Sequence, residues 1–186
     1  MTLIFMRHGQ ADHNINFRLN ESDHIASNLT DNGKREVLKN AKALKETIKA
    51  IDVIYCSSIL RCRQTAKIVE KYFDAKIPIK TDKRLNELRT GFDNRMPLVW
   101  LIRLFFSRNR LNKKFKAGQS ITEVSNGIGE FYKEIIKKHP NGNILVISHL
   151  YIFQIFCHHL YHKKLLLPWR PNTMRLKTAQ WHLFRT

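Results

Sequence analysis

The chain has 186 residues, of which 43% are hydrophobic, and it contains only 7 glycines and 5 prolines. This composition excludes a disordered tail and predicts one folded domain over residues 1–186. The formal net charge of +18 predicts a positive field that attracts anions such as phosphate esters, nucleic acid or acidic lipid headgroups, although lysines scattered along helix faces are more typical of a solvated surface.

The N-terminus and the cysteines bear on where the protein works. The first apolar strand begins at residue 2, which leaves no room for a signal peptide, so we expect a cytoplasmic protein. The three cysteines are odd in number, widely spaced and never in a C-x-x-C pair, which predicts reduced thiols rather than a disulfide framework or a zinc site. They are Cys56, Cys62 and Cys157.

The first predicted element is a buried strand that begins at residue 2 and whose apolar run, residues 3–6, ends abruptly at Arg7, His8 and Gly9. Open α/β sheets bind ligands in the crevice at the carboxyl ends of their strands, so this strand delivers a guanidinium and an imidazole to such a crevice. Gly9 lets the backbone turn tightly or approach a bound group, because it has no Cβ. The polar stretch 13–30 has no apolar periodicity and is predicted to be a loop near the site.

A helix, a strand and a second helix are predicted next. The first helix starts at Asn32 or Gly33 and is capped by Asp31 or Asn32. Residues 52–56 form a short buried strand, and Arg61 follows it at the start of the second helix. A second arginine therefore lies at the carboxyl edge of a strand. The apolar residues of the first helix, at helical spacing, are Val37, Leu38, Ala41, Leu44 and Ile48.

The middle of the chain contains an edge strand, a carboxylate and a basic apolar segment. Residues 77–80 are predicted to be an edge strand, because Pro78 would break a central ladder. The irregular segment 85–91 presents the carboxylate of Glu87. Residues 97–115 mix apolar and basic side chains in a piece too short and too charged to span a bilayer, which predicts a helix that covers the site or docks on a partner.

The last third of the chain contains two more strands. Ser120 begins a capping box for a helix, and the continuous apolar run 144–148 predicts a central strand that ends on His149. The helix 150–161 is apolar nearly all round, which predicts deep burial, and residues 178–184 alternate enough to form a last strand. The predicted buried stripe of the Ser120-capped helix is Ile121, Val124, Ile128, Phe131, Ile135 and Ile136.

Strands that alternate with helices predict a three-layer α/β/α sandwich with a mostly parallel central sheet. Strand ends then bring Arg7 with His8, Arg61 and His149 to one edge, and a connection supplies Glu87. Two arginine forks match phosphate oxygens, and a neutral imidazole can attack phosphorus and carry the phosphoryl group. A buried carboxylic acid can protonate the leaving oxygen. Because fixed cations neutralise the transferring group, no metal or other cofactor is expected.

Several short blocks of this chain resemble the histidine phosphatase superfamily, which has the phosphoglycerate mutase-like fold. They follow the family's order between residue 2 and about residue 150. They are Arg7-His8-Gly9 with Asn14 downstream, Leu29-Thr30-x-x-Gly33, Ser57-Ser58-x-Leu60-Arg61-x-Arg63-Gln64-Thr65-Ala66, Leu85-x-Glu87, Gly118-Gln119-Ser120 and Val146-Ile147-Ser148-His149. Ala11, Gln119 and Leu150 differ from the residues usual in the family, and none of these differences removes a reacting group.

The resemblance implies a function and a set of roles. His8 is the phosphorylated nucleophile and Glu87 the acid, with His149 as the third catalytic residue. The residues implied in phosphate binding are Arg7, Arg61, His149 and Asn14. A variable cap is implied over about residues 92–117. Because mutases of this family typically carry a longer insertion, the short chain favours a phosphatase, acting on a phosphorylated small molecule or a phosphoprotein.

Two alternatives remain beside a phosphatase. One is a mutase-type phosphotransferase of the same family. The other is a basic, non-catalytic module in which residues 96–116 hold nucleic acid or an anionic membrane. The full set of reactive groups favours an enzyme, because a module that only binds has no need of it. His13 and His24 are interpreted as loop residues, and the i, i+4 pair of His158 and His162 as a helix surface rather than a metal site.

Overall fold

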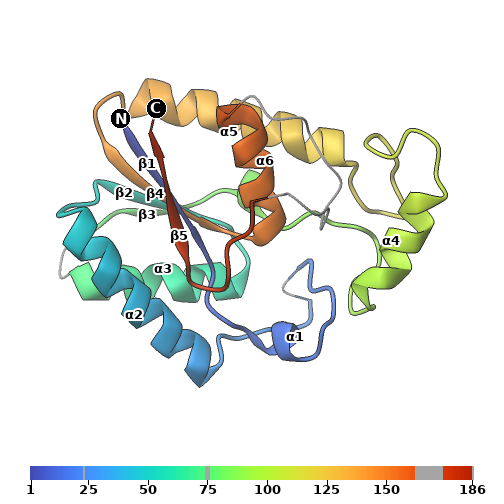
Figure 1. The fold of residues 1–186 in the computed structure, drawn as a ribbon, viewed down its shortest axis with the longest axis horizontal. Helices are drawn as coiled ribbons and strands as arrows, with labels where there is room; N and C mark the ends of the chain where they lie inside the picture. Colours follow the sequence, from blue (N-terminus) through green and yellow to red (C-terminus); the bar gives the residue numbers. More distant parts are fainter. Residues whose placement is uncertain (23, 74–75, 162–173, 186) are drawn as a thin grey trace.

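The computed structural model describes residues 1–22, 24–73, 76–161 and 174–185. At its centre is a five-stranded sheet in the order β3-β2-β4-β1-β5 (Figure 1). The strands are β1 (Thr2–Arg7), β2 (Val53–Cys56), β3 (Ile79–Thr81), β4 (Asn143–Ser148) and β5 (Trp181–Arg185). All neighbouring pairs run parallel except β1 and β5, so the predicted mostly parallel sheet is confirmed.

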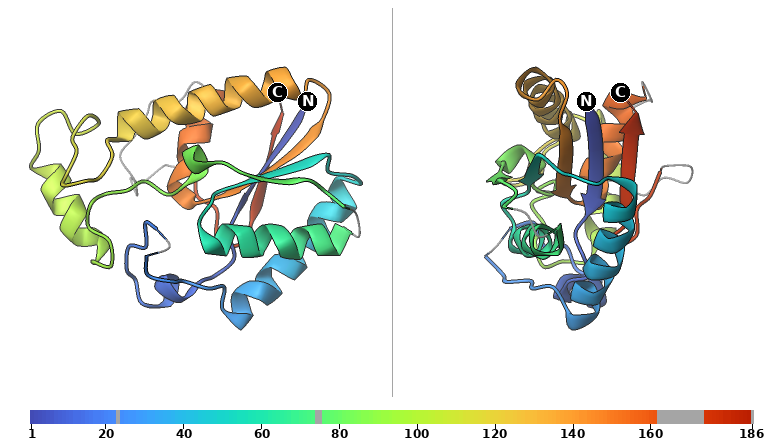
Figure 2. Two further views of the ribbon diagram at one scale, coloured as in Figure 1. Left: turned by 180° about the vertical axis from the view of Figure 1, so that it is seen from behind. Right: turned by 90° about the vertical axis from the view of Figure 1, so that its left-hand side faces the viewer.

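Helices cover both faces of the sheet. Helices α2 and α3 lie on one face and α5 and α6 on the other, whereas α1 and α4 lie beyond the three layers (Figures 1 and 2). The helices are α1 (Asp12–Ile15), α2 (Asp31–Thr47), α3 (Leu60–Phe73), α4 (Pro97–Phe105), α5 (Ile121–Lys138) and α6 (Leu150–Leu160), with a short 3-10 helix η1 (Lys83–Leu85). This arrangement is the predicted α/β/α sandwich.

The two faces of the sheet carry separate cores because side chains alternate along each strand. In β1, Leu3 and Phe5 pack in the core under α5 and α6, whereas Ile4 and Met6 pack in the core under α2 and α3. All four side chains are fully buried. The continuous apolar run at the start of the sequence is therefore the signature of a strand that is covered on both sides.

The strand register brings the predicted site residues to one edge of the sheet. Arg7, the last residue of β1, lies opposite Ser148 of β4, and Cys56 of β2 lies opposite Ile147. Because the carboxyl ends of these parallel strands lie side by side, the residues that follow the strands lie in the same crevice. Those residues are His8, Ser57 and His149.

Two details around α1 and α2 differ from the predictions. The cap of α2 is Thr30, whose hydroxyl accepts from Gly33 N at 2.9 Å, so the helix begins one residue earlier than predicted, at Asp31. The stretch 13–30 is not wholly a loop, because the short helix α1 begins before it and ends inside it. Asn14 stabilises that turn by accepting a hydrogen bond from Ala11 N at 2.9 Å.

The predicted apolar stripes are mostly buried. The exceptions are residues at which the predicted stripe is wider than the buried face of the helix. Leu38 of α2 is 46% exposed and Ile136 of α5 is 37% exposed, because each lies beside the buried line and not on it. Helix α6 is not buried all round, since Leu150 and Gln154 are only half-buried and line a cavity. The capping box of Ser120 and the edge position of β3 are confirmed. Within the described ranges, every helix is too short or too polar to cross a bilayer.

Candidate active site

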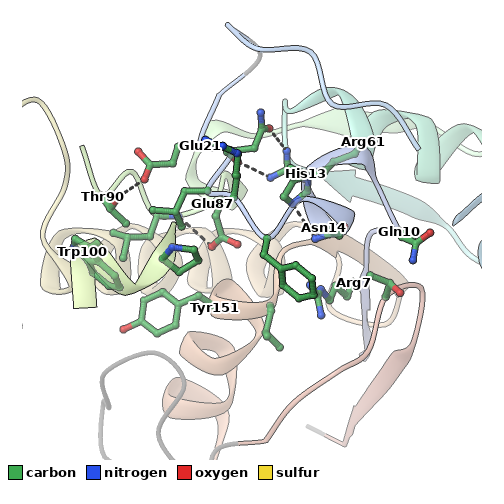
Figure 3. A pocket seen from close by; sticks show the side chains of 18 of the residues that line it. Arg7, Gln10, His13, Asn14, Glu21, Arg61, Glu87, Thr90, Trp100 and Tyr151 are labelled. Carbon is green, nitrogen blue, oxygen red and sulfur yellow. Dashed lines mark hydrogen bonds between the residues drawn. The ribbon is translucent and has the colours of Figure 1, made fainter. Parts of the chain in front are cut away.

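A cavity of about 350 Å³ lies at the carboxyl edge of the sheet, between the segment around α1 and the N-terminal ends of α4 and α6 (Figure 3). Four of the predicted site residues line it: Arg7, Asn14, Arg61 and Glu87. The other two, His8 and His149, are 2% and 0% exposed. They do not line the cavity themselves but lie directly beneath its floor, where both rings contact the lining residue Arg61. The structure therefore brings all six predicted residues together.

His8 is held in a single tautomer. Its Nδ1 lies 2.8 Å from the carbonyl oxygen of Gly9, and because a carbonyl can only accept, Nδ1 carries the proton. Nε2 then keeps its lone pair and accepts a hydrogen bond from Arg61 Nε at 3.2 Å. Burial, with the charges of Arg61 and Arg7, lowers the pKa of His8 well below its usual value. The ring is therefore neutral, with a nucleophilic nitrogen facing the arginine.

His149 is oriented from the opposite side. Its Nδ1 accepts from Arg61 Nη2 at 3.2 Å, and its Nε2 donates to Ser57 Oγ at 3.0 Å. The Ser57 hydroxyl in turn donates to Asn86 Oδ1 at 2.9 Å, which fixes the direction of this chain of hydrogen bonds. Burial and Arg61 lower the pKa of His149 well below its usual value. The rings of His149 and His8 are 5.2 Å apart between centroids, at 64° to each other.

Arg61 joins the two histidines and is itself held by Asn20. Its Nη1 donates to Asn20 Oδ1 at 2.6 Å and its Nη2 to the Asn20 carbonyl at 2.9 Å. The arginine is only 1% exposed, so these contacts compensate for the burial of a charged group. Asn20 is not among the predicted site residues, because a single asparagine in a polar stretch carries no periodicity or motif.

Arg7 presents a donor that lacks an acceptor. Its Nη1 donates to the Leu176 carbonyl at 3.0 Å, but its Nε is buried and has no hydrogen-bond partner among the residues that the structure describes. An unsatisfied buried donor is destabilising, and an anion in the cavity would satisfy it. Burial lowers the pKa of Arg7, while the nearby Glu87 opposes this shift. The side chain is thus arranged for an anionic ligand.

Glu87 is a carboxyl group that holds its proton more tightly than an exposed glutamate does. Burial raises its pKa, although Arg61 acts against this shift. Its Oε1 accepts a hydrogen bond from Leu88 N at 3.2 Å. The carboxyl group lines the same cavity as the two arginines (Figure 3). An acid and two fixed cations therefore share one cavity.

His13 corrects a prediction, because it is more than a loop residue. It lines the cavity, and its ring centroid lies 5.8 Å from that of His8. Its Nε2 accepts from Asn14 Nδ2 at 3.0 Å and its Nδ1 donates to Ser27 Oγ at 2.8 Å. Burial, Arg61 and Arg7 lower the pKa of His13 to about 3, so the ring is neutral.

Two features of the backbone contribute to the candidate site. Helix α6 begins directly after His149, and Arg61 lies in the first turn of α3, so the positive ends of two helix dipoles lie at the site. Gly9 is required by close packing against α2, a reason that differs from the predicted approach to a bound group, because a Cβ there would lie 2.7 Å from both Gly33 O and Val37 Cγ2. The turn after β1 can therefore pack closely against α2.

The outer wall of the cavity is largely apolar and contains a second acid. Leu88, Trp100 and Tyr151 line it, as labelled in part in Figure 3. Glu21 is 5% exposed and accepts hydrogen bonds from the Thr90 hydroxyl and from Gly91 N. Burial raises the pKa of Glu21. This acid is not among the predicted site residues, because it occurs in a polar segment without a motif.

The cysteines and surface histidines add no reactive group. Cys62 Sγ lies 3.5 Å from His149 Nε2, and burial raises the pKa of its thiol, so it is not a thiolate. His159 Nε2 lies 2.8 Å from the Ser125 carbonyl, and His162 lies outside the described residues. Within the described ranges, no three histidine, cysteine or acidic side chains are grouped to hold a metal ion.

Three comparisons place the chain among known proteins. The sequence model of the histidine phosphatase superfamily (branch 1) matches residues 3–185. A 2,3-bisphosphoglycerate-dependent phosphoglycerate mutase of Bartonella henselae is 33% identical over 92 residues, which is 48% of this chain and 43% of the mutase. The match thus spans less than half of that curated relative.

Solved structures show the same fold at low identity. YhfR of Bacillus stearothermophilus superposes with a TM-score of 0.81 at 22% identity, covering 98% of this chain and 89% of that one. The alpha-ribazole phosphatase of Shigella flexneri gives 0.76 at 19% identity, covering 98% and 89%. Together with the match over nearly the whole sequence, this fold shows that the chain belongs to the histidine phosphatase superfamily.

Proposed function

We propose that this chain is a phosphomonoester hydrolase that acts through a phosphohistidine on His8 and uses no metal ion. The observation that carries the proposal is the state of the His8 ring. The Gly9 carbonyl holds the proton on Nδ1, so the lone pair on Nε2 faces Arg61 at the floor of the cavity. A neutral, fixed imidazole beside a guanidinium fork is suited to attack a bound phosphoryl group.

The first half of the reaction transfers the phosphoryl group to the protein. Arg61 and Arg7 bind the phosphate oxygens, and the buried Arg7 Nε gains an acceptor. His8 Nε2 forms a bond to phosphorus as the bond from phosphorus to the ester oxygen breaks. Glu87 gives its proton to that oxygen, which leaves as the free alcohol. The fixed cations stabilise the charge that spreads over the equatorial oxygens.

The second half returns the protein to its starting state. The Glu87 carboxylate accepts a proton from a water molecule as the water oxygen attacks phosphorus, and the bond between His8 Nε2 and phosphorus breaks. Phosphate leaves and Glu87 is protonated again. His149, oriented by Ser57, accepts from Arg61 Nη2 through Nδ1 and so holds the guanidinium toward the phosphoryl group in both halves.

The wall of the cavity favours hydrolysis over mutase chemistry. A phosphoglycerate mutase that depends on 2,3-bisphosphoglycerate handles a ligand with two phosphates and a carboxylate, which needs cations away from the nucleophile. Here that wall contains Leu88, Trp100 and the buried acid Glu21. Arg18 also lines the cavity, but its Nη1 donates to the Asn94 carbonyl at 2.8 Å. The volume of about 350 Å³ suits a small phosphorylated molecule better than a folded phosphoprotein.

Hydrolysis of p-nitrophenyl phosphate in the presence of EDTA tests the proposal. We expect turnover by the native chain, loss of turnover in His8→Ala, and native turnover in His24→Ala, which removes an exposed histidine of the same polar segment. No hydrolysis by the native chain, or equal rates for native protein and His8→Ala, would contradict it. Transfer of phosphate to phosphoglycerate at a rate above hydrolysis would support the mutase alternative instead.

A further inference from the structure

Helix α4 carries an apolar surface that the proposed chemistry does not use. The side chains of this surface point away from the core, and those of Phe105 and Phe106 are 61% and 81% exposed. We define the α4 surface as Met96, Leu98, Val99, Ile102, Phe105 and Phe106, each at least 41% exposed. Most exposed large hydrophobic side chains among the described residues belong to this surface or to the segment around α1.

The opposite side of α4 is firmly packed. Trp100 and Leu104 are 3% and 2% exposed and belong to the core under α5 and α6. A helix that is apolar all round is normally buried all round. Since α4 is anchored on one side only, its outer side chains are held in place at the surface, and contiguous exposed apolar patches of this kind mark interaction sites.

The α4 surface is surrounded by positive charge. Residues 94–122 contain no aspartate or glutamate. Arg110 lies 4.8 Å from the ring centroid of Phe105, so cationic and aromatic side chains are interleaved. Of the basic residues, Lys114 forms an ion pair with Glu123 from the next helix. The full basic set is Arg95, Arg103, Arg108, Arg110, Lys113, Lys114 and Lys116.

The apolar surface continues toward the mouth of the cavity. Leu19 N donates to the Arg95 carbonyl at 2.9 Å, which joins the segment around α1 to the start of α4. In that segment Phe17 is 75% exposed and lines the cavity, as do Pro97 and Trp100 of α4. Whatever covers the α4 surface therefore lies beside the cavity.

We propose that the α4 surface docks on an anionic lipid membrane. Two attractions hold a peripheral protein on such a membrane. Aliphatic and aromatic side chains enter the interface, and the arginine and lysine side chains that flank them bind the anionic headgroups. A second copy of this chain fits poorly, because two faces with the same charge repel. Nucleic acid also fits poorly, because it leaves Leu98 and Ile102 exposed to water. Docking brings the cavity to the membrane surface.

Sedimentation with vesicles tests this proposal independently of the proposed hydrolysis. We expect the native protein to sediment with vesicles of mixed phosphatidylglycerol and phosphatidylcholine, weakly with phosphatidylcholine alone, and less as salt is raised. The double variant Phe105→Ser, Phe106→Ser should bind anionic vesicles at least tenfold more weakly. Its control, Leu38→Ser, removes an exposed leucine from α2 and should bind like the native protein.

Charge is tested by a second pair of variants. Arg108→Glu with Lys113→Glu should weaken vesicle binding at least tenfold, whereas Lys39→Glu with Lys42→Glu on α2 should reduce it less than threefold. His8→Ala should bind vesicles like the native protein. The phenylalanine double variant should hydrolyse p-nitrophenyl phosphate at the native rate. Failure of the proposed hydrolysis and failure of the proposed docking therefore give different results.

Three outcomes would overturn the proposal. The first is no sedimentation of the native protein with anionic vesicles. The second is native vesicle binding by both the phenylalanine double variant and the variant with Arg108 and Lys113 changed, which would assign the binding to the overall charge of the protein. The third is binding to a single-stranded oligonucleotide, but not to vesicles, that the Arg108 and Lys113 changes abolish, which would assign the surface to nucleic acid.

Discussion

The floor and the rim of the cavity are built in opposite ways. At the floor, His8, Arg61 and His149 are almost fully buried and fixed by hydrogen bonds to the backbone, to Asn20 and to one another. At the rim, Phe17 is exposed to solvent, and the exposed α4 surface lies beside the rim without lining the cavity. The floor has the rigidity that phosphoryl transfer needs, whereas the rim can determine what reaches it.

The largest expected effect is a difference in kcat between variants of two histidines whose rings lie beside each other. His8→Ala should lower kcat by at least about 10³-fold, because the proposed nucleophile is lost. His13→Ala should lower it by no more than about tenfold, because that ring only packs beside the nucleophile and binds Asn14. Steady-state kinetics on p-nitrophenyl phosphate measure both, and similar losses in the two variants would remove the distinction between them.

The second effect concerns the fork of Arg61. Arg61→Lys keeps the charge but cannot contact His8, His149 and Asn20 at once, so kcat should fall by about 10²-fold. Arg63→Lys, two residues along the same helix on an exposed position, should leave kcat unchanged. Retention of native kcat by Arg61→Lys would show that charge alone is sufficient.

The third effect is on pH dependence. Burial raises the pKa of Glu87, and the acid must be protonated to act, so kcat/KM should fall as pH rises through that raised value. The pKa of His8 is lowered, so the nucleophile stays neutral on the acid side, and the optimum should lie between the two. Glu87→Gln should lose about 10²-fold in rate together with the basic limb of the profile. A basic limb that persists in Glu87→Gln belongs to another group.

The smallest effect belongs to the rim. Phe17→Ala should raise KM for naphthyl phosphate by about fivefold and leave kcat unchanged, because an exposed ring contributes only binding contacts to the substrate. A comparable fall in kcat would place Phe17 in the reacting assembly and weaken the contrast between floor and rim.

The same contrast decides what the sequence could predict. The strands that end in Arg7-His8 and His149 are continuous apolar runs covered on both faces, so both the sheet and its reactive edge could be predicted. Asn20 and Glu21 could not, since a polar residue reaches the site only through the path of a segment without periodicity. The capping of α2 by Thr30 was missed because Asp31 and Asn32 are equally good caps in isolation.

The sequence predicts that the helix containing α4 either covers the site or docks on a partner, and it does not decide between these two roles. In the structure Trp100 lines the cavity while Phe105 and Phe106 face solvent, so one side of the helix borders the site and docking by the other side stays a prediction. Apolar spacing alone could not separate the two sides, since the helix is apolar on nearly every face.

Trapping the intermediate tests the central claim most directly. Native protein mixed with radiolabelled p-nitrophenyl phosphate and quenched in alkali should carry label on a peptide containing His8, because phosphohistidine survives alkali and is lost in acid. The label should be absent from His8→Ala and should accumulate in Glu87→Gln if the second half of the reaction is slowed more than the first. Turnover by the native chain without label on His8, or label on another residue, would contradict the account.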